Sequence, residues 1–293
     1  MKKQISPILI ITLLVSFLKV NAKELKLVPD NAALVYWQAF STMPTLTEKE
    51  QEALKELDKP TAEQREIQKK IISQSNLSVN LVKEFSDVNE CDWGITYKEG
   101  WLATMPHISK CRQLAHIILL HVIHTKDVKE KEKLLLALVR LSKHTTDGTI
   151  ISTLVGWAIL DMVIDYIDKP HKNLLTEIKK MDTKKQFKES LIVEKKITKL
   201  TINKIDNDAN HSLRKEFPLQ VKLSNLLPEY EALFDELIVS SELDNDELLN
   251  KAEAIETKVS KSKNIIVNKL MPTVKGIVRH KIKIENRIKE LKL

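Results

Sequence analysis

The sequence predicts an all-α protein built from antiparallel helical hairpins in a bundle, in part repeat-like, with a long basic helical segment at its C-terminal end. Three observations support this fold class. Nearly every long segment has helical periodicity, and no run alternates as a strand does. Hydrophobic residues make up 43% of the 293 residues, which is enough for a sizeable core. Only five glycines are present, far below the ordinary usage of about 7%.

The scarcity of glycine also narrows the classes of function. Loops that hold phosphates or dinucleotides need glycine where the backbone approaches the ligand closely. The sequence contains no G-x-G-x-x-G, no G-x-x-x-x-G-K-[ST], no G-x-S-x-G and no H-E-x-x-H motif. It therefore lacks the signatures of dinucleotide-binding proteins, P-loop proteins, hydrolases with a nucleophile elbow and zinc proteases.

Residues 1–22 are typical of a secretory signal peptide. Lys2 and Lys3 give a basic start, an apolar stretch covers 5–18, and Ala22 is a small residue at the expected cleavage point. We therefore expect an exported protein, periplasmic or extracellular. The alternative is that the segment stays in place as an N-terminal membrane anchor.

Residues 23–182 are expected to form a helical core domain. Its first helix is predicted to begin at Asn31, capped by the residue before it. Thr47 and Glu50 match a capping box, in which each side chain satisfies a free amide of the first helical turn. A long helix is expected to start near residue 61 and to run into the mid-80s.

Three close-set helices are predicted at 107–125, 129–144 and 149–168. The links between them are short, so neighbouring helices should run antiparallel. The third helix is apolar nearly all round, which indicates a buried core helix. The segment before them, 87–105, is irregular but carries two of the four tryptophans, and this aromatic content predicts that it packs inward.

The second half of the chain is predicted to be helical but less tightly packed. Residues 183–257 are expected to form a helical connector region. Its first part, 183–215, has few apolar positions, so we expect it to be extended or partly solvated.

Residues 258–293 are expected to form a basic helix, because they contain eleven Lys or Arg and only two Glu. Apolar residues recur there at alternating three- and four-residue steps, which is typical of a short coiled coil. This C-terminal seam comprises Val267, Leu270, Val274, Ile277, Lys281, Ile284, Ile288 and Leu291. The seam packs either on the protein's own helices or on another molecule.

Two groups of side chains could carry chemistry. His121 and His124 are neighbours on one helix face, and such a pair can bind zinc. No third ligand lies on the same face, however. Histidines are also favoured in the last turn of a helix because the helix dipole stabilises a positive charge there. We therefore predict no metal site and no cofactor. His121 and His124 are the residues to examine for metal binding. Asp161 and Asp165 could serve acid–base chemistry, or could pair with a cation such as Arg140 or Arg112.

Export would place Cys91 and Cys111 in a compartment that permits disulfides. A bridge between them would close a loop of about 20 residues and contribute on the order of 3 kcal/mol. The alternative is two unpaired thiols, and no motif supports a catalytic thiol.

Several uncommon short sequence segments occur in order in the first half of the chain. They include Tyr36-Trp37-Gln38-Ala39-Phe40, Cys91-Asp92-Trp93-Gly94, Met105-Pro106-His107-Ile108-Ser109-Lys110 and Asp147-Gly148-Thr149-Ile150. In these segments, residues 31–165 resemble a group of uncharacterised exported proteins of planctomycete-type bacteria. The resemblance implies an exported helical domain and carries over no catalytic residue. Cys111 stands where that group usually has alanine, which weakens the case for a 91–111 bridge as a family feature.

The resemblance also suggests where a ligand could bind, on the irregular segment and the helix start that follows it. The candidate ligand-binding residues are Asp92, Trp93, His107, Lys110 and Arg112. A polar cluster beside a tryptophan can bind an anionic or sugar-like ligand. Alternatively, Asp92 and Arg112 form a structural pair that holds the segment in place.

We therefore expect an exported, non-enzymatic helical scaffold or interaction protein of the cell envelope. Its C-terminal helix would mediate self-association or contact a protein partner, and its basic residues could touch an anionic envelope surface. No nucleic acid partner is predicted, because the body of the chain is mildly acidic and the basic end has no interleaved aromatic residues. The alternative is a hydrolase or small-ligand binder with its site at the 91–112 segment.

Overall fold

A computed structural model of the chain describes residues 30–85, 87–146, 148–167, 172–208, 211–217 and 221–291. No strand occurs among them, and the predicted all-α class is confirmed. The α-helices are α2 (Ala32–Thr42), α3 (Glu48–Lys55), α4 (Ala62–Phe85), α5 (Pro106–His124), α6 (Val128–Thr145), α7 (Ile150–Asp165), α8 (Lys172–Lys179), α9 (Thr183–Asn207), α10 (Leu227–Ser240), α11 (Asn245–Lys261), α12 (Ile265–Leu270) and α13 (Val274–Glu290). The 3-10 turns are η1 (Tyr97–Leu102), η2 (Arg214–Glu216) and η3 (Leu223–Leu226). The predicted signal peptide lies outside the described residues.

The first two of these helices begin with side-chain caps. Asn31 Oδ1 accepts a hydrogen bond from the Ala33 amide at 3.0 Å, so Asn31, and not Asp30, caps α2. The predicted capping box forms at α3. The Thr47 amide donates to Glu50 at 2.9 Å, and the Glu50 amide donates to Thr47 Oγ1 at 3.3 Å. The long helix predicted to follow is α4.

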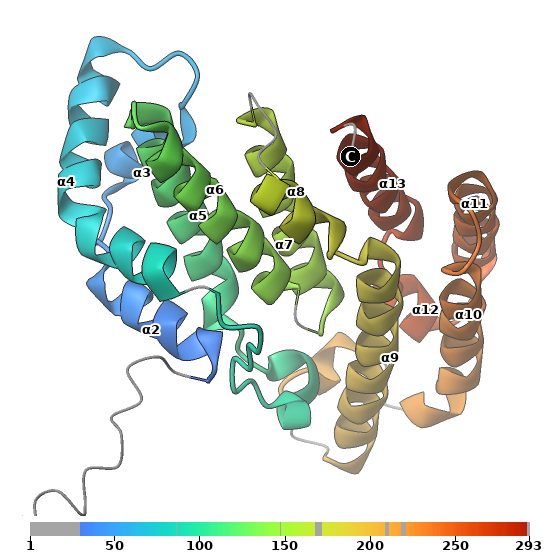
Figure 1. Cartoon of the computed structure of the whole chain (residues 1–293). Helices are drawn as coiled ribbons and strands as arrows, with labels where there is room; N and C mark the ends of the chain where they lie inside the picture. Colours follow the sequence, from blue (N-terminus) through green and yellow to red (C-terminus); the bar gives the residue numbers. More distant parts are fainter. Residues whose placement is uncertain are drawn as a thin grey trace, which may run out of the picture. The chain divides into compact units, whose positions relative to one another are not determined.

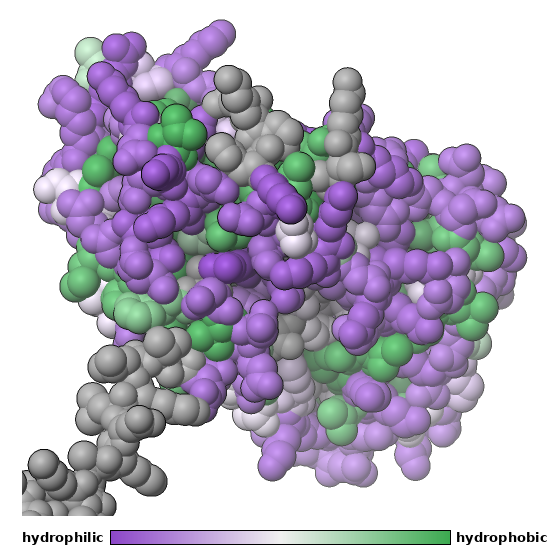
Figure 2. All heavy atoms as spheres, viewed as in Figure 1, coloured by the Kyte–Doolittle hydropathy of each residue, from purple (hydrophilic) through white to green (hydrophobic). Residues whose placement is uncertain are grey.

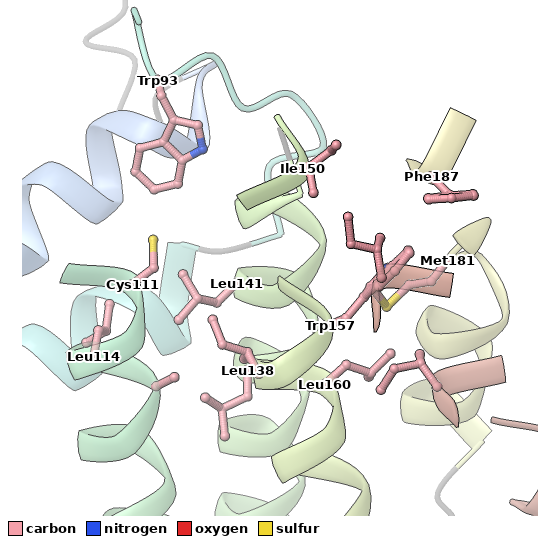
Figure 3. Packing of buried hydrophobic residues seen from close by; sticks show 14 of the residues in the cluster. Trp93, Cys111, Leu114, Leu138, Leu141, Ile150, Trp157, Leu160, Met181 and Phe187 are labelled. Carbon is pink, nitrogen blue, oxygen red and sulfur yellow. The ribbon is translucent and has the colours of Figure 1, made fainter. Parts of the chain in front are cut away.

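The three predicted core helices are α5, α6 and α7, which lie side by side (Figure 1). The long helix α4 packs on α2 and α5, and α8 covers α6. In α7, Trp157 and Leu160 are fully buried, and Trp157 lies beside Met181, which precedes α9 (Figure 3). The centroids of the Trp157 and Phe187 rings are 6.4 Å apart. The prediction of a buried third helix is therefore confirmed.

The expectation of an extended or partly solvated connector at 183–215 is wrong for the helix α9. This helix has 25 residues and packs on α7, α10 and η1. Its buried face mixes apolar residues such as Phe187 and Ile202 with small polar ones such as Thr198 and Thr201. The Thr198 and Tyr230 hydroxyls are hydrogen-bonded at 2.8 Å, and the Thr201 hydroxyl donates to a carbonyl within α9 at 2.9 Å. Because the stripe includes satisfied polar residues, counting apolar positions alone underestimated its packing.

The basic C-terminal segment packs on the chain's own helices, with α13 against α7 and α11. Most residues of the C-terminal seam are buried, including Lys281, which is 2% exposed. Many cations of the segment are paired with acids of the same chain: Lys258 with Glu236, Lys275 with Glu253, Lys283 with Asp161, and Arg287 with Asp161 and Asp165. Residues 31–293 group into one compact unit, so the segments predicted as core, connector and C-terminal helix are parts of one body.

Candidate functional site

Trp93 closes the loop between α4 and α5 over the helical core, with its indole pointing inward (Figure 3). The side chain is 3% exposed, and its ring N–H donates to the His144 carbonyl at 2.8 Å. The indole stacks on the His107 ring, with centroids 4.6 Å apart, and on the Tyr36 ring at 5.4 Å. This cluster joins α2, α5 and α6 to the loop, which makes the loop a structural plug. The prediction that the segment packs inward is confirmed at this residue.

His107, a predicted ligand-binding residue, is part of the plug. It is 1% exposed, and neither ring nitrogen has a hydrogen-bond partner among the described residues. Burial lowers the pKa of this imidazole to about 4, so the ring is neutral at pH 7. An unsatisfied buried polar group costs about 1–3 kcal/mol, which the stacking on Trp93 partly offsets. A neutral, enclosed ring has no free face for an anionic ligand.

The other predicted ligand residues do not meet at the buried indole. Asp92 Oδ1 accepts from the Gly94 amide at 2.8 Å, and the Asp92 amide donates to Asn31 Oδ1 at 2.9 Å, so this residue shapes the loop. Arg112 forms no ion pair with Asp92 within the described part of the chain, and lines a separate pocket between α3 and α5. Lys110 is exposed on α5. The structure therefore brings two of the five candidates together and separates the remaining three.

The two histidines considered as metal ligands, His121 and His124, have protein partners. His121 Nε2 is hydrogen-bonded to Ser75 Oγ at 3.0 Å, and His124 Nδ1 donates to the Leu120 carbonyl at 3.0 Å. Burial, with a smaller contribution from His124, lowers the pKa of His121 to about 4. Among the residues that the structure describes, no group of three or more His, Cys, Asp or Glu side chains could hold a metal ion.

Cys91 and Cys111 are both thiols in the structure and are not joined by a disulfide. Cys111 is buried in α5, while Cys91 is half-buried in the loop. Burial raises the pKa of the Cys111 thiol to about 12. A thiol with so high a pKa is a poor nucleophile at neutral pH, which agrees with the absence of a catalytic-thiol motif.

Asp161 and Asp165 have cationic partners, but not the ones expected. Arg287 binds both carboxylates, and Lys283 Nζ lies 2.6 Å from Asp161. Pairing with a cation of an adjacent helix is confirmed, but the two examples named, Arg140 and Arg112, are not the partners, because the pairing comes from α13, which lies far away in the sequence. These ion pairs join the C-terminal halves of α7 and α13.

The starts of α7 and α13 leave an open groove of about 550 Å³ between them. Ile150, Leu154 and Ala158, at four-residue steps, form the α7 wall. The α13 wall includes Ile277 and His280, and the segment before α13 contributes Pro272 and Thr273. The first turns of α7 and α13 line the same groove, and their later turns are joined by the Asp161–Arg287 pair, so the two helices run parallel. The groove lies between their N-terminal ends.

The groove is uncharged. Its one titratable wall residue is His280, and burial, which outweighs the opposing effect of Asp161, lowers the pKa of its imidazole below the usual value. The ring is therefore neutral at pH 7. At the rim, Ile151 is 55% exposed and projects from the second position of α7. The groove and the exposed Ile151 therefore form one continuous apolar surface at the starts of the two helices.

The sequence did not point to this groove, although it held one signal. Gly276 lies inside α13, where glycine is unfavourable by about 1 kcal/mol relative to alanine. A side chain there would enter the groove without a close clash, since a Cβ would lie 3.5 Å from its nearest neighbour in Thr273. A glycine in the first turn of a helix, in a glycine-poor chain, was therefore the clue.

No helix within the described residues is long and apolar enough to cross a membrane. The face seen in Figure 2 is mostly covered by polar side chains, with apolar residues gathered in small patches. Comparison with protein-family models, with curated proteins and with solved structures finds no match to this chain.

Proposed function

We propose that the chain is an exported, non-enzymatic helical interaction protein of the cell envelope, and that it associates with a second copy through the groove between α7 and α13. The apolar groove carries this proposal. Its walls bear no charged side chain, and Ile151 stands at its rim with 55% of its surface exposed. A knob and a hollow on one surface are what a two-fold contact needs, because each copy can then insert its knob into the other.

The contact would involve the C-terminal helix through its groove-lining face, which includes the seam residue Ile277, while the other residues of the C-terminal seam remain packed inside the protomer. Burying one isoleucine side chain contributes about 1.5–3 kcal/mol. Because Ile151 is 55% exposed in the protomer, about half of this, roughly 0.8–1.6 kcal/mol, is gained per copy. A two-fold contact gains it twice, so its loss should raise the dissociation constant of the dimer at least about tenfold.

The test is light scattering and sedimentation on the purified protein over about 1–100 μM. We expect a dimer for the wild type and a monomer for Ile151→Glu. The substitution should not harm folding, because an acidic residue in the first turn of a helix is favourable. The matched control is Leu77→Glu in α4, a position 59% exposed and not part of the groove. A monomeric wild type, or a dimer that tolerates Ile151→Glu, would remove self-association.

Export is supported by the sequence of residues 1–22. Expression of the full chain in a bacterium, followed by fractionation and mass measurement, tests it. We expect a product that begins at residue 23 in the periplasm or medium. A full-length product in the membrane fraction would instead support the N-terminal anchor. The resemblance of residues 31–165 to exported planctomycete-type proteins stays a prediction.

A further inference from the structure

The pocket between α3 and α5 contains a cluster of basic side chains. It has a volume of about 280 Å³. Lys55 comes from the last turn of α3, while Ser109, Arg112 and His116 lie at three- and four-residue steps along one face of α5. Leu46 and Leu54 form an apolar wall. Side chains from two helices and a loop therefore converge on one small hollow.

The two cations of this pocket are exposed to solvent and have no acidic partner among the described residues. Within the described part of the chain, neither Lys55 nor Arg112 has a hydrogen-bond or ion-pair partner. Lys70, by comparison, is paired: its Nζ lies 2.8 Å from the carboxylate of Glu50 in the same helix α3 that carries Lys55. None of the described residues that line the pocket is acidic.

The pKa of His116 is affected by this local excess of positive charge. Its Nδ1 is buried and has no hydrogen-bond partner among the described residues. Burial, followed by the charges of Arg112 and Lys55, lowers the pKa of the imidazole below its usual value. Placing cations together without an acid is unfavourable, and a bound anion would relieve it.

We propose that this pocket binds a small organic phosphate monoester. Two cations match a dianionic oxyanion, and the planar guanidinium of Arg112 can hold two of its oxygens at once. The Ser109 hydroxyl donates to the Pro106 carbonyl at 3.3 Å, and it can serve as a further donor to the ligand by exchanging this long bond. It lies near the start of α5, where the helix dipole also favours negative charge. The volume exceeds what one oxyanion needs, and the leucine wall can contact the carbon part of the ligand. This site is separate from the groove and does not depend on the proposed self-association.

Calorimetric titration of the purified protein tests the site with three probes: glycerol phosphate, inorganic phosphate and glycerol. Each is added to about 10 mM, which covers affinities down to the millimolar range. We expect saturable binding of glycerol phosphate, weaker binding of inorganic phosphate, and none of glycerol. Equal or tighter binding of inorganic phosphate would overturn the assignment of an organic ligand. No saturable binding of either phosphate would overturn the site.

Charge-removing variants locate the binding. Arg112→Gln and Lys55→Gln should each weaken glycerol phosphate binding about tenfold, because each removes one charge-assisted contact. Lys110→Gln is the matched control, since it removes an equal charge from an exposed position of the same helix that does not line the pocket. Circular dichroism checks that the variants are folded. An equal loss in Lys110→Gln would show that only general surface charge attracts the anion, and the proposal would fail.

Discussion

Lys281 is a charged side chain buried within the C-terminal seam, and its partner Glu285 should be essential to stability. The ammonium is 2% exposed and lies 2.6 Å from Glu285 Oε1, with Asn245 Oδ1 at 3.4 Å. Glu285 also accepts a hydrogen bond from the Thr183 hydroxyl at 2.8 Å. Replacing Glu285 by alanine would leave a buried cation with one weak amide contact.

The expected loss follows from the burial of the pair. Removing one partner of a buried ion pair costs about 3–5 kcal/mol. Glu285 retains 18% exposure, so we expect the lower end, about 3 kcal/mol in the free energy of unfolding. The double variant Lys281→Met/Glu285→Ala should regain most of this, to within about 1–2 kcal/mol of wild type, because an apolar side chain of similar length needs no partner.

Urea unfolding followed by circular dichroism and by tryptophan fluorescence measures these differences, with coincident transitions as the check on two-state behaviour. The control is Glu290→Ala, an exposed acid of the same helix, which should change stability by less than about 0.5 kcal/mol. The reasoning is refuted if Glu285→Ala costs less than about 1 kcal/mol, or if the double variant is no more stable than the single one.

Two further predictions concern pH and the loop. Burial lowers the pKa to about 4 in three imidazoles, those of His107, His121 and His144. Between about pH 6.5 and 4 the unfolded chain therefore binds more protons than the folded one. The free energy of unfolding should fall as pH falls through that window, by up to about 1.4 kcal/mol per pH unit for each histidine. Urea titrations across the window that give constant stability would contradict this. At Gly100, with φ +60°, an added Cβ would overlap the Thr201 hydroxyl and lie 3.1 Å from its Cα. Gly100→Ala should therefore lower the melting temperature more than Gly94→Ala, where φ is +68° but no atom lies within 4 Å; equal shifts would count against it.

Local signals predicted the helices of the first half well. The capping box of Thr47 and Glu50, and the periodicity of the segments around it, depend on residues within a few positions of each other. The burial of Trp93 was predictable from the residue type, because a large indole in an irregular segment avoids water only by packing inward.

Contacts between distant residues could not be read in the same way. Asp161 and Arg287 are 126 positions apart, and the charge pattern around Asp161 suits any nearby cation equally well. The same limit applies to the phosphate pocket, because nothing local to Lys55 or Arg112 shows that α3 and α5 bring them together. Candidate residues such as His107 were recognised as unusual, but the sequence could not show that the ring is enclosed.

The pairing of α7 with α13 has a consequence for the order in which the protein is made. The carboxylate of Asp161 leaves the ribosome 126 residues before the guanidinium of Arg287 that binds it. At ordinary rates of synthesis this is a delay on the order of ten seconds. During that time α7, the most apolar of the described helices, lacks the neighbour that covers one of its sides. A nascent chain that stops before α13 would therefore expose this surface to aggregation, and a factor that shields apolar segments until synthesis is complete would raise the yield of folded protein.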